Sequence, residues 1–263
     1  MKKNAVLSVL LLLFGFFSFA APNPENDEQA IPLSDVQVQE LIEEAEREDV
    51  NAQYNLGVIY EVQRNFDLAE KYYKLAAEQG NAYAQYNLGA LYYDQEKTGY
   101  AERYWKQAAD QGNISAQQNL GWLYYTEGKL DFAEKYLKQA GDKGDIVALN
   151  HLGILYKEQE ELDLAEKYYK MAADRGFLTA QFNLGVLYKK EGKLDLAEKY
   201  LKKAADQGHY FALSNLGVLY HNLGRTDLAE EYSERMKQHE LWKRMPVNKK
   251  PAVRPMIRRI STR

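Results

Sequence analysis

The sequence predicts an all-α fold, a right-handed α-solenoid of six helix-turn-helix repeats with a capping helix at each end. A glycine recurs every 32 residues, at Gly57, Gly89, Gly121, Gly153, Gly185 and Gly217. Apolar residues around each glycine follow the spacing of a helix, and a second helical pattern separates one glycine from the next. A period of this length, built from two helices that cannot bury their apolar stripes alone, is typical of stacked helical hairpins.

The first helix of each repeat carries Ala, Leu, Gly and Tyr at positions i, i+4, i+5 and i+8, as in Ala52, Leu56, Gly57 and Tyr60. Most of these residues share one helical stripe. A glycine inside a helix costs about 1 kcal/mol relative to alanine. We therefore expect each of the six glycines to permit a close helix contact.

The second helix begins at an aspartate in most repeats. Four aspartates precede a glutamate by three residues, which is the spacing of a capping box: Asp67 and Glu70, Asp131 and Glu134, Asp163 and Glu166, Asp195 and Glu198. Three glutamates precede a lysine by four residues and predict ion pairs, namely Glu70 with Lys74, Glu134 with Lys138, and Glu166 with Lys170. Glycines then end the second helices, at Gly80, Gly112, Gly144, Gly176 and Gly208.

Both ends of the array depart from the repeat. Residues 34–49 predict an N-terminal capping helix, started by Ser34 or Asp35, and residues 50–240 hold the six repeats. The sixth repeat loses its Ala-Ala pair and its final glycine, as a capping helix does. Residues 241–263 form the end of that helix and a tail with eight basic residues and no acidic one, which predicts disorder.

The first 20 residues predict a secretory signal, because Lys2 and Lys3 precede an apolar run with small residues near Ala20. An uncleaved anchor is the alternative. Residues 21–33 read as a linker. We expect an exported protein, periplasmic or secreted, with no integral membrane segment after cleavage, and the absence of cysteine means that packing alone must stabilise it.

The pattern A-x-x-x-L-G-x-x-Y, followed by A-A-x-x-G-[ND], resembles the Sel-one-like repeat family of the tetratricopeptide-like superfamily, in a bacterial exported form. The resemblance covers about residues 50 to 240. One departure is the short turn between the helices, such as TEGKLD at 126–131, which has the spacing of an ordinary tetratricopeptide repeat. Both labels predict the same architecture.

The sequence lacks common motifs of catalytic sites. It contains no G-x-x-x-x-G-K or G-x-G-x-x-G phosphate loop and no S-x-x-K motif, and its four histidines lack metal-ligand spacing. We therefore expect no catalysis, no cofactor and no bound metal.

The family resemblance implies that the first helices line a concave face which meets an extended partner. The position before each Leu-Gly pair reads Asn55, Asn87, Asn119, His151, Asn183 and Asn215, and these side chains either bind a peptide backbone or bond within their own hairpins. Aromatic side chains mark the earlier repeats and lysines the later ones. The remaining candidates for the groove are Tyr86, Tyr93, Trp122, Tyr125, Lys157 and Lys189.

These patterns predict a non-catalytic protein-protein interaction scaffold of the bacterial envelope or secreted space, which binds a peptide segment in its groove. The alternatives are a protein that binds glycans or peptidoglycan fragments and a secreted virulence factor that acts on host proteins. The basic tail either contacts an anionic surface or stays solvated. Nucleic acid is not expected as a partner, because residues 21–240 carry a net charge of about −14.

Overall fold

The structure, a computed structural model, describes residues 35–244, and within this range all regular structure is helical. The predicted signal, the linker and the tail after Arg244 lie outside the described residues. Capping helix α2 (Asp35–Glu46) comes first. The first helices of the repeats are α3 (Val50–Val62), α5 (Ala82–Asp94), α7 (Ile114–Thr126), α9 (Ile146–Glu158), α11 (Leu178–Lys190) and α13 (Tyr210–Asn222). The second helices are α4 (Phe66–Glu78), α6 (Thr98–Asp110), α8 (Leu130–Asp142), α10 (Leu162–Asp174), α12 (Leu194–Asp206) and α14 (Thr226–Arg244).

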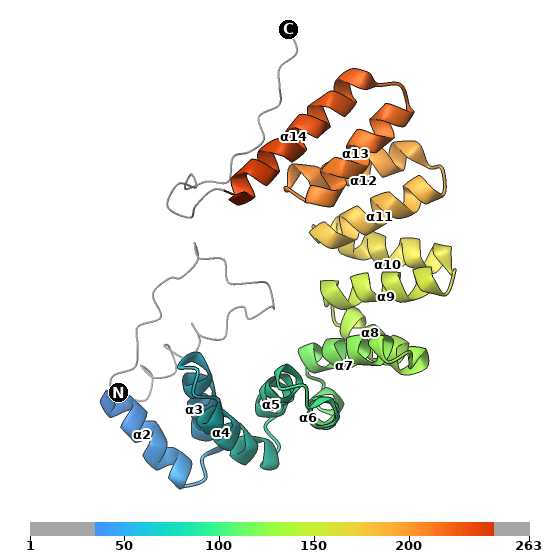
Figure 1. The fold of residues 1–263 in the computed structure, drawn as a ribbon. Helices are drawn as coiled ribbons and strands as arrows, with labels where there is room; N and C mark the ends of the chain where they lie inside the picture. Colours follow the sequence, from blue (N-terminus) through green and yellow to red (C-terminus); the bar gives the residue numbers. More distant parts are fainter. Residues whose placement is uncertain (1–34, 245–263) are drawn as a thin grey trace, which may run out of the picture. The chain divides into compact units, whose positions relative to one another are not determined.

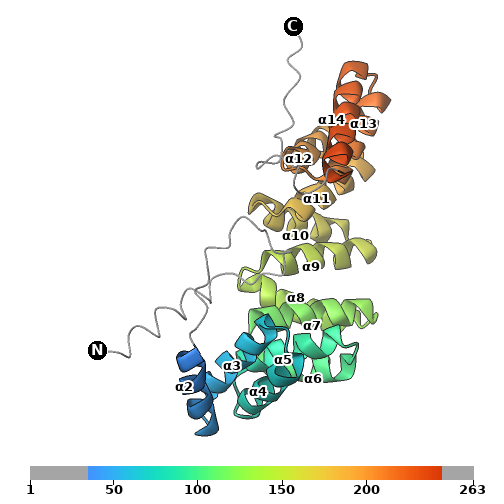
Figure 2. The ribbon, with the colours of Figure 1, turned by 60° about the vertical axis from the view of Figure 1, so that its left-hand side comes forward.

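The described residues divide into two compact units between residues 76 and 77, which we describe separately as unit 1 (35–76) and unit 2 (77–244). In unit 1, α2 packs on α3, and Ala45 is buried against Ala52 and Leu56. In unit 2, each helix from α5 to α14 packs on the next one along the chain (Figures 1 and 2). The fold is the predicted all-α stack of helical hairpins.

The glycine inside each first helix faces a large side chain from the second helix of the same repeat. We call this residue the cross-helix side chain. It is Tyr73, Trp105, Leu137, Tyr169 or Leu201 in the first five repeats, and each of these residues is buried. A Cβ atom on Gly121 would lie 2.5 Å from Leu137 Cγ, closer than side chains can pack. The predicted close approach is therefore confirmed in five repeats.

The sixth repeat does not follow this rule, so the prediction was wrong for Gly217. Its cross-helix position holds Ser233, which is exposed. The nearest atoms to a Cβ on Gly217 are Ser233 Oγ at 3.8 Å and the Ala229 carbonyl oxygen at 3.9 Å. A small polar residue has replaced the bulky apolar one, and no close contact forms.

The predicted capping boxes were also wrong. Helix α8 begins at Leu130, because the Lys129 carbonyl already accepts a hydrogen bond from Ala133 N, and Lys129 makes no side-chain cap. Asp131 therefore lies inside the first turn, where a carboxylate suits the positive end of the helix dipole. The same shift applies to α10 and α12, which begin at Leu162 and Leu194. In α4 the capping side chain is that of Asn65, whose Oδ1 accepts from Leu68 N at 3.3 Å.

Side-chain caps occur instead at the first helices. The side chains of Asp49, Asn81, Asn113, Asp145 and His209 each accept a hydrogen bond from a backbone N–H three residues later. The predicted glycine ends of the second helices are confirmed, since Gly80, Gly112, Gly144, Gly176 and Gly208 all have a φ between 86° and 95°. Only glycine adopts this left-handed conformation at no steric cost.

Two of the three predicted ion pairs form, with Lys74 Nζ at 2.6 Å from Glu70 and Lys138 Nζ at 2.5 Å from Glu134. Glu166 instead pairs with Lys193 at 3.1 Å, because Lys193 reaches it from the following hairpin. These carboxylates also accept hydrogen bonds from a tyrosine of the next first helix. Tyr156 Oη donates to Glu134 at 2.6 Å, and the same bond joins Tyr124 to Glu102, Tyr188 to Glu166 and Tyr220 to Glu198.

A second set of bonds between repeats comes from buried glutamines. In four first helices the glutamine Nε2 donates to a carbonyl at the end of the preceding second helix, from Gln53 to Ala45, Gln85 to Ala77, Gln117 to Ala109 and Gln181 to Ala173. Carbonyls at a helix end lack partners within the helix. Each of these four carbonyls also accepts a hydrogen bond from the backbone N–H three residues later, so the glutamine is a second donor that joins its first helix to the helix before it.

Candidate functional site

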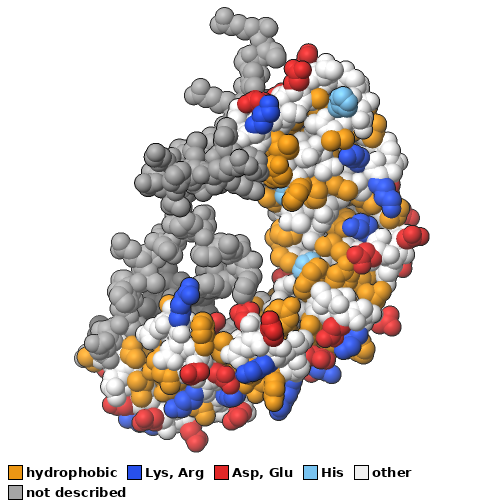
Figure 3. Space-filling model, in the orientation of Figure 1, with side chains coloured by type: hydrophobic (Ala, Val, Ile, Leu, Met, Phe, Trp, Pro, Cys, Tyr) orange, Lys and Arg blue, Asp and Glu red, His pale blue; other side chains and the backbone are white. Residues whose placement is uncertain are grey.

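The candidate site is the face of unit 2 formed by the first helices, which we call the first-helix face. Helix α7 contacts α9, and α11 contacts α13, so these helices lie in one layer. Hydrophobic side chains gather over this layer, with histidine among them (Figure 3). The second helices form the other layer, and glutamates on α8 and α10 accept hydrogen bonds from tyrosines of the first helices.

An aromatic group lies at the junction of α7 and α9. The Trp122 ring stacks on Tyr125, with centroids 5.0 Å apart, and on His151, with centroids 4.3 Å apart. All three side chains are half-buried. Three of the predicted site residues therefore form one cluster that still reaches solvent.

The charge state of this cluster follows from its burial. Burial lowers the pKa of His151 to about 4, so the ring is neutral near pH 7. Burial, together with a hydrogen bond to Glu158, raises the pKa of Tyr125 to about 12. Gln118 Nε2 lies 3.4 Å from His151 Nδ1 and fixes the orientation of the ring. The cluster offers flat rings that are uncharged near pH 7.

The predicted row of asparagines is present, but its members form different hydrogen bonds. Asn183 Nδ2 donates to Asn150 Oδ1 at 3.0 Å. Asn215 Nδ2 donates to the Phe211 carbonyl at 2.9 Å, and its Oδ1 accepts from Lys189 Nζ at 3.0 Å. A carboxamide has two N–H donors and an oxygen with two lone pairs, so both residues keep unused capacity.

The other asparagines are half-buried in their first helices. Asn87 and Asn119 lie on the first-helix face of unit 2, on α5 and α7. Asn55 lies on α3 and therefore belongs to unit 1. The row is interrupted at His151, whose ring stacks on Trp122.

The aromatic side chains are not confined to the earlier repeats, which corrects the predicted division into an aromatic and a cationic half. Phe182 on α11 stacks on His209, with centroids 4.4 Å apart, and Phe211 on α13 is 62% exposed. Sequence reasoning missed these residues because it sought aromatic side chains in the earlier repeats only. Phe182 could have been found from the repeat itself, since it occupies the position of Tyr86 in the second repeat.

The predicted tyrosines at the start of the face differ in how far they reach solvent. Tyr93 is 42% exposed and rests on Trp105, with ring centroids 5.3 Å apart. Tyr86 is half-buried, and its carbonyl accepts a hydrogen bond from Trp105 Nε1 at 3.1 Å. Trp105 therefore contacts both tyrosines at this end of the first-helix face.

The lysines lie at the carboxyl ends of α9 and α11. Lys157 and Lys190 are exposed and form no ion pair within residues 35–244, whereas Lys189 is half-buried against Asn215. Cations are favoured at helix C-termini. These lysines place positive charge on one edge of the first-helix face, whose other side chains are mainly aromatic rings and carboxamides.

The described residues contain neither a candidate metal site nor a helix that could span a membrane. No three His, Asp or Glu side chains of the described residues come together as a metal site would require. None of the helices α2 to α14 combines the length and the apolar character that crossing a membrane requires.

Comparison with known proteins places the repeats in two related families. The Sel1 repeat matches residues 50–81, 82–113 and 147–177, and the tetratricopeptide repeat matches residues 114–140, 178–206 and 212–236. No curated protein matches the sequence. Both kinds of repeat therefore occur in one array.

Solved structures show the same fold. The chain is 25% identical to a protective antigen of uropathogenic Escherichia coli with an SLR fold, at a TM-score of 0.64 over 81% of this chain, and it spans only 53% of that protein. It is 24% identical to a Sel1 repeat protein of Oxalobacter formigenes, at a TM-score of 0.63 over 80% of this chain and 98% of the other. It is 25% identical to YrrB, a TPR protein with an unusual peptide-binding site, at a TM-score of 0.53 over 68% of this chain and 96% of YrrB. The chain is thus a Sel1-like repeat protein of the tetratricopeptide-like superfamily, with repeats of both kinds in its array.

Proposed function

We propose that this protein is a non-catalytic scaffold that binds a peptide segment of a partner protein on the first-helix face of unit 2. Repeats of the Sel1 and tetratricopeptide kinds build protein-interaction scaffolds and are generally not catalytic. The similarity to YrrB, which has a peptide-binding site, supports the same role.

The observation that carries the proposal is the composition of the face. Half-exposed aromatic side chains at Trp122, Tyr125 and Phe182 share the first helices with the carboxamides of Asn119, Asn183 and Asn215. Tyrosine and tryptophan are frequent anchors of interfaces. Carboxamides can both donate to and accept from a peptide backbone. A peptide laid across the helices would meet both kinds of group in turn.

Peptide capture tests this role. We expect the full chain to retain peptides from a displayed library of random short peptides, and Trp122→Ala to reduce the affinity of the recovered peptides about tenfold or more, because it removes an anchor. Calorimetry measures the affinities. The matched control is Phe132→Ala, which removes a 54% exposed aromatic ring from α8 in the other layer. Equal losses in both variants would remove the first-helix face from the proposal.

A glycan, such as a peptidoglycan fragment, is the second candidate. The stacked rings of Trp122 and Tyr125, beside carboxamides, provide the flat apolar surface and the hydrogen-bond groups that a sugar ring also uses. Titration of purified cell-wall fragments against the same chain distinguishes the two. Binding of fragments that is lost in Trp122→Ala, with no binding of peptides, would favour the glycan.

We also propose that the protein works after export, in the periplasm or outside the cell, on the basis of residues 1–20. Secreted action on host proteins is one form of this proposal, and the similarity to a protective antigen supports it. The basic residues after Arg244 would then contact an anionic surface. Mass spectrometry of the mature protein should show cleavage after Ala20, and fractionation should place it outside the cytoplasm; an intact N-terminus in the cytoplasm would contradict the proposal.

A further inference from the structure

Two histidines of unit 2 depart from the repeat. His151 stands before a Leu-Gly pair, where the other five repeats have an asparagine, and His209 stands at the cap of a first helix. The equivalent caps in the first four repeats are Asp49, Asn81, Asn113 and Asp145. Each departure replaces a side chain that takes up no proton near neutral pH with one whose ordinary pKa is about 6.5. The chain therefore has titratable rings at two positions that the fold elsewhere builds without them.

Both histidines lie in aromatic groups of the first-helix face. His151 stacks on Trp122, with ring centroids 4.3 Å apart, at the junction of α7 and α9. His209 stacks on Phe182 of α11, with centroids 4.4 Å apart, and lies 6.1 Å from the ring of Phe211. Both rings therefore belong to the surface that we propose to bind the peptide.

Each ring also has a contact at Nδ1 that suits the neutral form. Ala212 N donates to His209 Nδ1 at 3.3 Å and shares this bond with the His209 carbonyl at 3.1 Å. Gln118 Nε2 lies 3.4 Å from His151 Nδ1. A protonated imidazole carries a hydrogen on both nitrogens and accepts from neither donor. At His209 the added charge would also lie at the positive end of the α13 dipole.

The start of α13, where His209 lies, packs against helices with charges of both signs. These are Lys203 and Asp206 on α12 and Arg235, Lys237 and His239 on α14, whereas residues 178–188 of α11 carry no charge. Arg235 pairs with Asp206 at 3.1 Å, and His239 lies against Tyr210, with ring centroids 5.3 Å apart. Burial is the cause that lowers the pKa of His209 below 6.5.

Helix α9, which carries His151, packs against α7, α8 and α10. Helix α7 has no charged residue, and its Tyr125 stays neutral because its pKa is raised to about 12. The charged groups on α9 itself and on the halves of α8 and α10 that run beside His151 are Lys157, Glu158, Lys138, Asp142, Lys170 and Asp174. Burial is again the cause, and it lowers the pKa of His151 to about 4.

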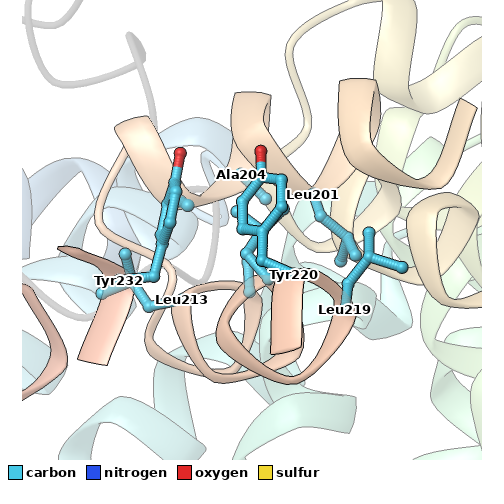
Figure 4. Close-up of a cluster of buried hydrophobic side chains, with 9 residues drawn as sticks. Leu201, Ala204, Leu213, Leu219, Tyr220 and Tyr232 are labelled. Carbon is cyan, nitrogen blue, oxygen red and sulfur yellow. The ribbon is translucent and has the colours of Figure 1, made fainter. Parts of the chain in front are cut away.

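The core of the sixth repeat does not depend on the His209 ring. Tyr220 and Tyr232 are buried with ring centroids 5.5 Å apart, in one cluster with Leu201 and Leu213 (Figure 4). Ala212 N keeps its bond to the His209 carbonyl when the side-chain bond is lost. Protonation of His209 would therefore change the first-helix face and leave the hairpin folded.

We propose that the first-helix face of unit 2 holds its peptide while His151 and His209 are neutral and releases it in acid. The inference rests on the proposed function, since it names the regulation of the same face. A peptide laid on the stacked rings removes them further from water, which disfavours their charged form. A bound peptide and a bound proton therefore oppose each other, so that each histidine weakens the peptide as it becomes protonated.

The pH dependence of peptide affinity tests the proposal. Peptides recovered on the wild-type chain at pH 7.5, and chosen to lack His, Asp and Glu, are titrated by calorimetry between pH 8 and 4. We expect a constant affinity above pH 7 and a loss of up to about tenfold per pH unit below 6.5, as His209 becomes protonated. A further loss should follow as the pH approaches 4, from His151. Circular dichroism at each pH checks that the chain stays folded.

The other repeats supply the variants. His209→Asn introduces the cap of the second and third repeats and should remove the first loss, and His151→Asn completes the row of asparagines and should remove the second. The readout is the shape of the pH profile and not the affinity at pH 7.5, because both rings lie on the binding face. His221→Asn, at an exposed position of α13, is the matched control and should leave both losses in place.

Three outcomes would overturn the proposal. If the wild type holds its peptides equally well from pH 8 to 4 while Trp122→Ala weakens them, the peptide face stands and the acid release is wrong. A pH profile that persists when both histidines are replaced would assign the effect to other groups. If the wild-type chain retains no peptide at any pH, both this inference and the proposed function fall.

Discussion

At the scale of single residues, one glycine in each first helix determines how closely the two helices of a repeat can pack. Glycine within a helix costs about 1 kcal/mol relative to alanine. That cost is offset where a large side chain occupies the space, as Leu137 does beside Gly121. It is not offset beside Gly217, where the nearest side-chain atom to a Cβ is 3.8 Å away. The same residue type is therefore required in one repeat and dispensable in another.

This difference gives a matched pair of substitutions. Gly121→Ala would place its Cβ 2.5 Å from Leu137 Cγ, so we expect a loss of about 1–3 kcal/mol in the free energy of unfolding from overpacking, and a larger loss for Gly121→Val. Gly217→Ala should stabilise the protein by up to about 1 kcal/mol through helix propensity. Urea denaturation of both variants measures the two effects. A Gly121→Ala variant that is more stable than the wild type, together with a Gly217→Ala variant that is less stable, would show that the glycine contacts are misassigned.

The His151 ring provides a second test at this scale. Because burial lowers its pKa to about 4, we expect its ring protons to show no titration between pH 5.5 and 8 in NMR spectra. Trp122→Ala removes the ring that stacks on His151 and should move the pKa back toward 6.5, the ordinary value. A wild-type His151 that titrates near 6.5 would contradict the stacked and buried arrangement.

At the scale of helices, the repeats are joined by two kinds of side-chain bond, which the sequence motifs did not reveal. The glutamines of first helices donate to carbonyls eight residues earlier, across the turn between repeats. The tyrosines of first helices donate to glutamates 22 residues earlier. Both bonds span two helices, so they depend on how hairpins stack and not on any local pattern.

A buried glutamine gives the prediction for the first kind of bond. Gln181 Nε2 donates to the Ala173 carbonyl at 3.3 Å, and its Oε1 accepts from Gln207 Nε2 at 2.7 Å. Gln181→Ala would remove both hydrogen bonds and leave Gly176 N as the donor to the Ala173 carbonyl, so we expect a loss of about 1–3 kcal/mol in the free energy of unfolding for the two bonds together. Gln107→Ala, at an exposed position of α6, is the control and should change it by less than about 0.5 kcal/mol. Thermal and urea denaturation provide the measurement.

The tyrosine-glutamate bonds give a prediction about pH. Hydrogen bonds from Lys138 and Tyr156 lower the pKa of Glu134 below its usual 4.5, so its contribution to stability is complete above pH 4.5 and is lost as the pH falls through the folded-state pKa. Burial and Glu134 raise the pKa of Tyr156 from 10.0 to about 12, so the contribution of the phenol is complete below pH 10 and is lost as the pH rises through 12.

Unfolding free energies measured across pH should therefore decline at both limits. Glu134→Gln should flatten the acid limb, and Tyr156→Phe should flatten the alkaline limb, because each variant removes one of the titrating groups. An acid limb that keeps its slope in Glu134→Gln would show that the bond contributes nothing to the linkage.

At the scale of the whole molecule, the repeat pattern was sufficient to predict the fold, because periodicity is repeated in every copy and each copy confirms the others. The capping boxes failed because Asp131 and its equivalents have the spacing of that motif but lie two residues past the N-cap position, inside the first turn of the helix. The candidate site was predicted only in outline. The hydrogen-bond partners of Asn183 and Asn215 lie 33 and 26 residues away in the sequence, so no local pattern reveals them. Phe211 was missed because it lies outside the repeat positions selected as candidates.

The separation of bonds within repeats from bonds between repeats has a consequence for how such a chain can change. The contact of a glycine with its cross-helix side chain, in the first five repeats, is completed inside one hairpin, whereas the glutamine and tyrosine bonds recur at the same repeat positions in the junctions that carry them. Duplication or deletion of one whole repeat would leave the remaining junctions with the same pairs of bonding positions. Genetic gain or loss of whole modules could thus lengthen or shorten the binding surface without redesigning any joint.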